Sequence, residues 1–91
     1  MTRYYFDIDD GDQFHRDDLG AYANSLREVR DGAIAALPEI AQQMSPDRDH
    51  RVFTIYVRDK KGHAIFKATL SFTAQWRPDQ LKAQTSHATL Q

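Results

Sequence analysis

The sequence predicts an α+β domain of the order β-β-α-β-β, with one main helix packed on a four-stranded antiparallel sheet. Three observations predict it: two pairs of segments with a hydrophobic period of two, a turn inside each pair, and one stretch of helical period between the pairs. A chain of 91 residues has room for only one core. We therefore expect a single domain over residues 1–75 and a flexible or partly helical tail over residues 76–91.

The first hairpin is predicted for residues 4–17. In residues 4–8 apolar side chains alternate with others, as in a half-buried strand, and residues 13–17 can run back beside them with Phe14 pointing into the core. Asp and Gly in the connection are typical of a hairpin turn, because Gly tolerates positive φ and Asp accepts bonds from nearby amides.

The same connection holds four aspartates in residues 7–12, so a metal loop and a catalytic carboxylate cluster are the alternatives. In an EF-hand loop numbered from Asp7, glycine is needed at position 6, but Gly11 stands at position 5. Paired catalytic carboxylates need burial and convergence, whereas a hairpin rim is well hydrated. The pattern therefore favours a solvated turn without a metal.

The helix is predicted to begin near Ser25, since Glu28 stands three residues later, at the spacing of a capping box. Pro38 lacks an amide hydrogen and is expected to kink the helix or to restart it as a second short one. One apolar stripe recurs at steps of three or four and should pack on the sheet: Leu26, Val29, Ala33, Leu37, Ile40 and Met44.

A second hairpin follows the polar loop of residues 45–51. Its strands are residues 52–58 and 64–73, joined by the turn at residues 59–62. With the first hairpin, these strands should turn one apolar face toward the helix: Tyr4, Phe6, Phe14, Phe53, Ile55, Val57, Phe66, Ala68, Leu70 and Phe72.

The opposite, outer face of the sheet carries the candidate site. Side-chain parity places there Tyr5, Asp7, His15, Thr54, Tyr56, Arg58, Lys67 and Thr69. Tyrosines beside cationic side chains can form a protein-interface hot spot or a base-stacking platform, and an ordinary solvated face is the third interpretation. The candidate binding residues are Tyr5, Tyr56, Arg58 and Lys67.

Composition argues against several function classes. The chain has no cysteine, its four histidines lack metal-ligand spacing, and its serines and four glycines form neither a nucleophile elbow nor a phosphate loop. We therefore expect no enzyme, no cofactor and no metal. A net charge of −1 does not favour general binding to nucleic acid or membranes. The first residues lack a signal-peptide run, so we expect a cytoplasmic protein.

Charge is segregated along the chain. Residues 1–24 carry six aspartates against two arginines, whereas residues 45–77 carry seven lysines and arginines against three aspartates. The two parts should attract each other within the domain, and the alternative is that the basic part meets an acidic partner.

Three stretches carry a resemblance to a family of short bacterial proteins of unknown function. They are the opening "YYFD" with its aspartate-rich hairpin, a D-x-x-G turn, and the V-R-D-x-x-G hairpin, within residues 3–73. The resemblance implies no activity. Asp18-Leu19-Gly20 and the stretch "SLREVRDGAIAAL" also resemble the N-terminal domain of HicB-type antitoxins, which implies a hairpin-plus-helix architecture.

The sequence thus predicts a small non-enzymatic interaction module, acting as a homodimer or binding a protein partner. A HicB-like antitoxin component that neutralises a small toxin is the alternative. Nucleic-acid binding is less favoured.

Overall fold

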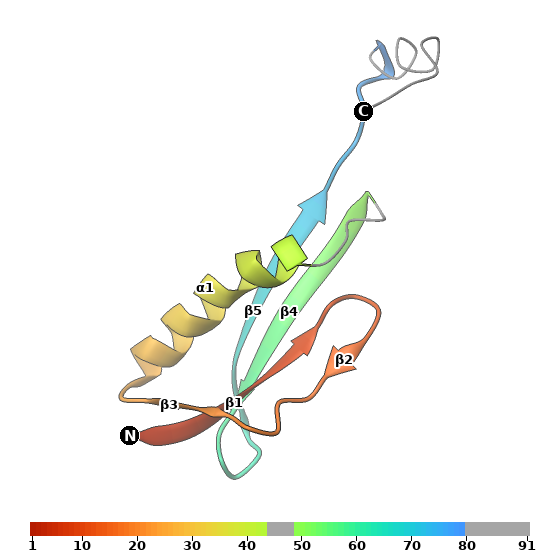
Figure 1. Ribbon diagram of the computed structural model, residues 1–91. Coiled ribbons are helices and arrows are strands. Elements are labelled where there is room, and N and C mark those ends of the chain that lie inside the picture. Colours follow the sequence, from red (N-terminus) through yellow and green to blue (C-terminus); the bar gives the residue numbers. More distant parts are fainter. Residues whose placement is uncertain (44–48, 80–91) are drawn as a thin grey trace.

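In the computed structural model, which describes residues 1–43 and 49–79, one helix covers one face of an antiparallel sheet (Figure 1). The predicted α+β class is confirmed, with one more strand than expected. The elements are β1 (Thr2–Asp9), β2 (Phe14–His15), β3 (Ala21–Ala23), α1 (Leu26–Gln43), β4 (His50–Arg58) and β5 (Ala64–Thr73).

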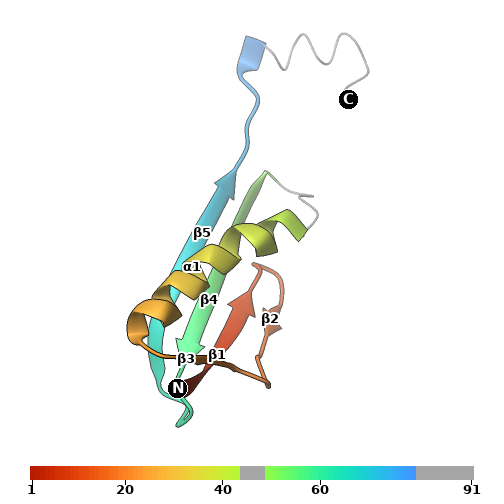
Figure 2. The same ribbon diagram turned by 60° about the vertical axis from the view of Figure 1, so that its left-hand side comes forward.

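The sheet has the order β2-β1-β4-β5, and β3 also pairs with β1. The short strand β2 pairs with the C-terminal end of β1, and β3 pairs with its N-terminal end. On its other side β1 pairs with β4, and β4 pairs with β5 along nearly its whole length. Figure 2 shows α1 lying across the face formed by β4 and β5.

The predicted helix cap is present. Ser25 Oγ accepts a hydrogen bond from the Glu28 amide at 3.1 Å, and Glu28 Oε1 accepts one from the Asn24 amide at 2.7 Å. The helix includes Pro38 and continues to Gln43, so it does not restart as a second element.

The core lies between α1 and the centre of the sheet. The buried apolar residues are Ala23, Val29, Ala33, Leu37, Phe53, Ile55 and Val57. The predicted stripe is confirmed at its three central positions, but Leu26 is 65% exposed because it stands at the first helical position, beside an open groove. Met44 lies outside the described residues.

The prediction that Phe14 enters the core is wrong. The register pairs Asp9 with Phe14, so Phe14 lies on the outer face and is 56% exposed. A strand alternates its faces, so a shift of one residue in register moves every side chain to the other side. For the same reason His15, opposite Ile8, does not share the outer face.

The alternation predicted for β5 also fails at Ile65. The register shifts between Val57 and Arg58, so that Arg58 pairs with Ala64 and Ile65 is left as the extra residue of a bulge. Ile65 therefore lines the groove beside α1 together with Phe66.

Residues 78–79 are helical, and residues 80–91 lie outside the part of the chain that the structure describes, so the predicted tail stays a prediction. Within the described residues, no helix is both long enough and apolar enough to cross a membrane.

Candidate functional site

The four predicted binding residues come together on the outer face of the sheet. The register of β1 and β4 places Tyr5 opposite Arg58, and that of β4 and β5 places Tyr56 opposite Lys67. The two pairs have different surroundings. Arg58, opposite Tyr5, is enclosed by polar contacts, whereas Tyr56 and Lys67 are exposed.

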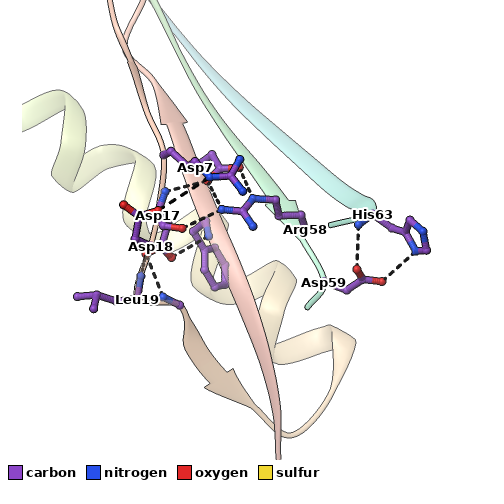
Figure 3. Close-up of polar contacts among 10 residues, drawn as sticks. Asp7, Asp17, Asp18, Leu19, Arg58, Asp59 and His63 are labelled. Carbon is purple, nitrogen blue, oxygen red and sulfur yellow. Dashed lines mark hydrogen bonds and ion pairs between the residues drawn. The ribbon is translucent and has the colours of Figure 1, made fainter. Parts of the chain in front are cut away.

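Arg58 is held by two aspartates (Figure 3). Its Nε donates to Asp7 Oδ2 at 2.8 Å, and its Nη2 donates to the Asp17 carbonyl at 2.8 Å and to Asp7 Oδ1 at 3.3 Å. The side chains of Arg58 and Asp7 are only 15% and 6% exposed. We call Asp7, Asp17 and Arg58 the aspartate clamp.

Asp17 connects the clamp to the backbone of β1. Its Oδ2 accepts a hydrogen bond from the Phe6 amide at 3.0 Å, and its Oδ1 accepts from the Leu19 and Gly20 amides, both at 3.0 Å. Burial acts to raise the pKa of Asp17, but these amides outweigh it and lower the pKa below its usual value. Asp17 is therefore ionised near neutral pH.

Asp7 closes the other half of the clamp. Its Oδ1 accepts a hydrogen bond from the Asp17 amide at 2.9 Å. Burial acts to raise the pKa of Asp7, whereas the bonds from Arg58 and from that amide lower it, and the net shift is downward. A carboxylate that already accepts three such donors fits a structural role better than proton transfer.

Tyr5 packs against this cluster. The Arg58 guanidinium carbon lies 4.6 Å from the centre of the Tyr5 ring, and that of Arg3 lies 5.8 Å from it. Arg3 also donates from Nε and Nη2 to the Leu19 carbonyl, at 3.0 and 2.6 Å. Arg3 and Arg58 thus help to hold the loop of residues 16–20 against β1, with the Tyr5 ring packed against both guanidinium groups.

The aspartate-rich connection is a hairpin turn, as predicted. Asp9 Oδ1 accepts a hydrogen bond from the Gly11 amide at 2.9 Å, and Asp10 Oδ1 accepts from the Asp12 and Gln13 amides, both at 2.8 Å. The Gln13 and Asp12 amides lower the pKa of Asp10 to about 2. Across residues 1–43 and 49–79, no three His, Asp or Glu side chains are grouped as metal ligands would be.

The segregated charges meet inside the domain. Besides the clamp, Arg51 is buried at 9% exposure, and its Nε donates to the Asp10 carbonyl at 3.1 Å. Its Nη2 lies 3.4 Å from Asp12 Oδ2. Two of the basic residues that an acidic partner would need, Arg51 and Arg58, are therefore turned toward aspartates of the first hairpin.

An exposed aromatic patch remains on the outer face, formed by Phe14, Tyr56 and Lys67. The rings of Phe14 and Tyr56 lie 6.4 Å apart at an angle of 53°, and Tyr56 is 36% exposed. Sequence reasoning missed Phe14. Because β1 ends at Asp9 and β2 begins at Phe14, the length of the turn was the available signal: it places these two residues opposite each other.

The residues of the aspartate clamp all belong to the three motifs of residues 3–73. Asp7 belongs to the opening stretch, Asp17 and Gly20 form the D-x-x-G turn, and Arg58 belongs to V-R-D-x-x-G. The last motif also forms its own turn, since Asp59 Oδ1 accepts from the Lys61 and His63 amides at 2.9 Å each. Figure 3 shows Asp59 beside His63.

Comparison with known proteins identifies one family. The family model described as Domain of unknown function (DUF6894) matches residues 3–71. No curated protein and no solved structure matches the chain. Because the family match spans the helix and all five strands except Thr2 of β1 and the last two residues of β5, the chain belongs to the DUF6894 family of domains of unknown function.

Proposed function

We propose that the protein is a non-enzymatic interaction module of the cytoplasm that acts as a homodimer and binds a protein partner through the aromatic patch. The observation that carries the proposal is the exposed pair of Phe14 and Tyr56 beside Lys67 on the outer face. Aromatic side chains are enriched in interface hot spots, where they bury a large area with little loss of conformational freedom.

The surroundings of the patch support a role in binding. Next to it, Thr54 is buried and lies in hydrogen-bond distance of Thr69, with 3.3 Å between their Oγ1 atoms. The clamp lies on the other side, where Arg58 is paired with Asp7 and donates to the Asp17 carbonyl. The patch is thus an apolar and cationic centre on a rigid sheet, bordered by satisfied polar groups, which is the usual arrangement of a protein interface.

The state of the carboxylates supports a non-enzymatic role. A general acid needs a carboxyl group whose pKa is raised toward neutral pH. Instead, the pKa values of Asp7, Asp10 and Asp17 are all lowered, because amides or arginines donate to each of them. These groups hold the fold and have no proton to offer at neutral pH.

A protein partner is favoured over nucleic acid because the chain has a net charge of −1 and the clamp engages Arg58. Lys67 is then the main cation of the patch. A nucleic-acid platform would need several phosphate contacts and would lose affinity steeply with salt.

The test is affinity capture of the tagged full chain at low salt, from nuclease-treated and untreated lysates, with Tyr56→Ser and Phe14→Ser compared with the wild type. We expect a stoichiometric protein that survives nuclease and is lost in both variants. Tyr22→Ser is the matched control, because Tyr22 is 61% exposed but lies on β3, away from the patch. Capture of nucleic acid alone, or equal capture by all variants, would contradict the proposal.

A HicB-like antitoxin is the second candidate. It is favoured by the capped helix that follows the turn at Asp18-Leu19-Gly20, as in the antitoxin domains that the chain resembles. Co-expression with a small toxin encoded beside it should restore growth if this function is correct. Growth that stays arrested for every such toxin would exclude it.

A further inference from the structure

The outer edge of β5 is unlike the other edges of the sheet. From Phe66 to Thr73 the strand pairs regularly with β4 on one side, and no described strand pairs with it on the other. Lys67 is the only charged residue of β5, and the strand contains no proline. Natural proteins usually protect a long edge with charges, proline or a covering element, because free backbone groups invite another strand.

An apolar groove runs beside this edge. It has a volume of about 600 Å³ and lies between the start of α1 and the start of β5, lined by Leu26, Arg27, Val29, Arg30, Ile65 and Phe66. Leu26 and Ile65 are 65% and 40% exposed. Ile34 stands four residues after Arg30, on the same flank of α1, and is 42% exposed.

We propose that a second copy of the chain pairs with the β5 edge, antiparallel and about a two-fold axis near Thr69, so that the two sheets become continuous and the two α1 helices lie side by side. This inference rests on the homodimer proposed above and names its surface. It also assigns the groove a function, since the flank of the partner helix would cover it.

The residues of β5 are complementary to themselves in this arrangement. A two-fold axis at Thr69 places Phe66 of each copy opposite Phe72 of the other, both on the helix face, where aromatic pairs are favourable. Lys67 then faces Ser71 of the partner, so the strand's only charge meets no like charge. Apolar residues meet on one face and polar residues on the other.

The helices are complementary in charge. α1 and β5 run in the same direction (Figures 1 and 2), so antiparallel β5 strands bring the start of each helix near the end of the other. Arg27 and Arg30 lie in the first turns with side chains 88% and 60% exposed, and within the described residues they pair with Asp31 of their own helix. The last turn of α1 has no basic residue, so its carbonyl groups are a suitable partner for these arginines.

Sedimentation velocity of the full chain over a dilution series tests the surface. Ser71 is exposed, so Ser71→Lys and Ser71→Glu should both leave the monomer folded. Ser71→Lys places a lysine opposite Lys67 of the second copy, twice by symmetry, and should raise the dimer dissociation constant about tenfold or more. Ser71→Glu should leave it unchanged or lower it. Combining Lys67→Glu with Ser71→Lys should restore association.

A second pair of variants tests the helix flank. Ile34→Glu should weaken the dimer, whereas Ala35→Glu, on the adjacent exposed position that points away from β5, should not. A wild-type chain that is monomeric at all concentrations overturns the homodimer and this surface together. A wild-type dimer that both Ser71→Lys and Ile34→Glu leave intact overturns only the surface, as does a 1:1 complex in which a different protein occupies β5.

Discussion

At one edge of the sheet β1 is covered along its length, by β2, by the Asp17 carboxylate at the Phe6 amide, and by β3. At the other edge β5 meets no strand of the described chain. Short strands and a loop thus protect the first edge, while the second is long and carries one charge. At the β1 edge, an aspartate side chain therefore takes the place of strand pairing between β2 and β3. At the β5 edge, where we propose association, the strand is regular from Phe66 to Thr73.

The edge at β1, here called the closed edge, depends on contacts between distant parts of the sequence. Asp7 and Arg58 are 51 residues apart, and Asp17 reaches both the β1 backbone and the Arg58 side chain. The edge at β5, here called the open edge, depends only on the alternation of side chains along β5 itself. Substitutions at the first edge should therefore change the free energy of unfolding, and substitutions at the second should change association.

The largest effect is expected for Arg58→Met. Removing Arg58 leaves Asp7 charged and largely desolvated without its ion-pair partner, which should give the largest loss in the free energy of unfolding. Urea unfolding measures the free energy of unfolding, with Lys60→Met as an exposed control expected within about 0.5 kcal/mol of the wild type. Arg58→Lys should recover only part of the loss, since lysine cannot bond both carboxylate oxygens in the same fork. Equal stability of Arg58→Met and Lys60→Met would show that the clamp is not structural.

Gly20→Ala comes next. Gly20 has a φ of +75°, and an added Cβ would lie 2.9 Å from the Tyr4 carbonyl oxygen, so we expect a loss of about 2–3 kcal/mol. Substitutions at two other glycines serve as comparisons, because they separate the effect of φ from that of steric contact. Gly62 has a φ of +88° but open space around it, so Gly62→Ala should cost about 1 kcal/mol. Gly32→Ala, inside α1 with nothing within 4 Å, should stabilise the protein by about 0.5–1 kcal/mol.

Low pH should lower the free energy of unfolding through the aspartates of the closed edge. The pKa of Asp10 is about 2 against an ordinary value of 3.8, and those of Asp7 and Asp17 are also lowered. A group whose pKa is lower in the folded state stabilises the fold above its unfolded pKa, and this contribution is lost as the pH falls through the folded value. The free energy of unfolding should therefore fall between about pH 4 and about pH 2, by about 2 kcal/mol from Asp10 alone.

Urea unfolding of the wild type and of Asp10→Asn at about pH 6 and about pH 3 measures this dependence. The variant should be less stable at the higher pH and should change less with pH. If the free energy of unfolding of Asp10→Asn changes with pH as much as that of the wild type, other carboxyl groups cause the acid sensitivity.

The smallest effect on folding is expected for Lys67→Thr, which removes the one charge of β5. Lys67 is exposed, so the free energy of unfolding should change by less than about 0.5 kcal/mol. Association should become less specific, because an uncharged edge accepts more registers and more strands. Light scattering should then detect species larger than a dimer at high concentration, and Lys60→Thr should not produce them.

Much of the fold could be predicted because its signals are local. The alternation in β1, in β4 and in β5 from Phe66 onward, the Ser25 cap and the aspartate turn were all readable within a few neighbouring residues, and the structure confirms them. The third strand was missed because Ala21–Ala23 is too short to show a period.

The candidate site could be predicted only in part. Parity correctly placed Tyr5, Tyr56, Arg58 and Lys67 on one face. It could not show that Arg58 is enclosed while Tyr56 is exposed, because that difference depends on where the loop carrying Asp17 lies. It also failed at Phe14, whose face depends on the register of the turn.

The sequence by itself determined the helix, the long strands, their order and the faces of those strands, because side-chain period and capping act over a few neighbouring residues. Only the tertiary structure decided the register at Phe14, the bulge at Ile65 and the meeting of Asp7, Asp17 and Arg58. These features require segments far apart in the chain to lie side by side, so their energies come from closure of the whole sheet and have no local signature.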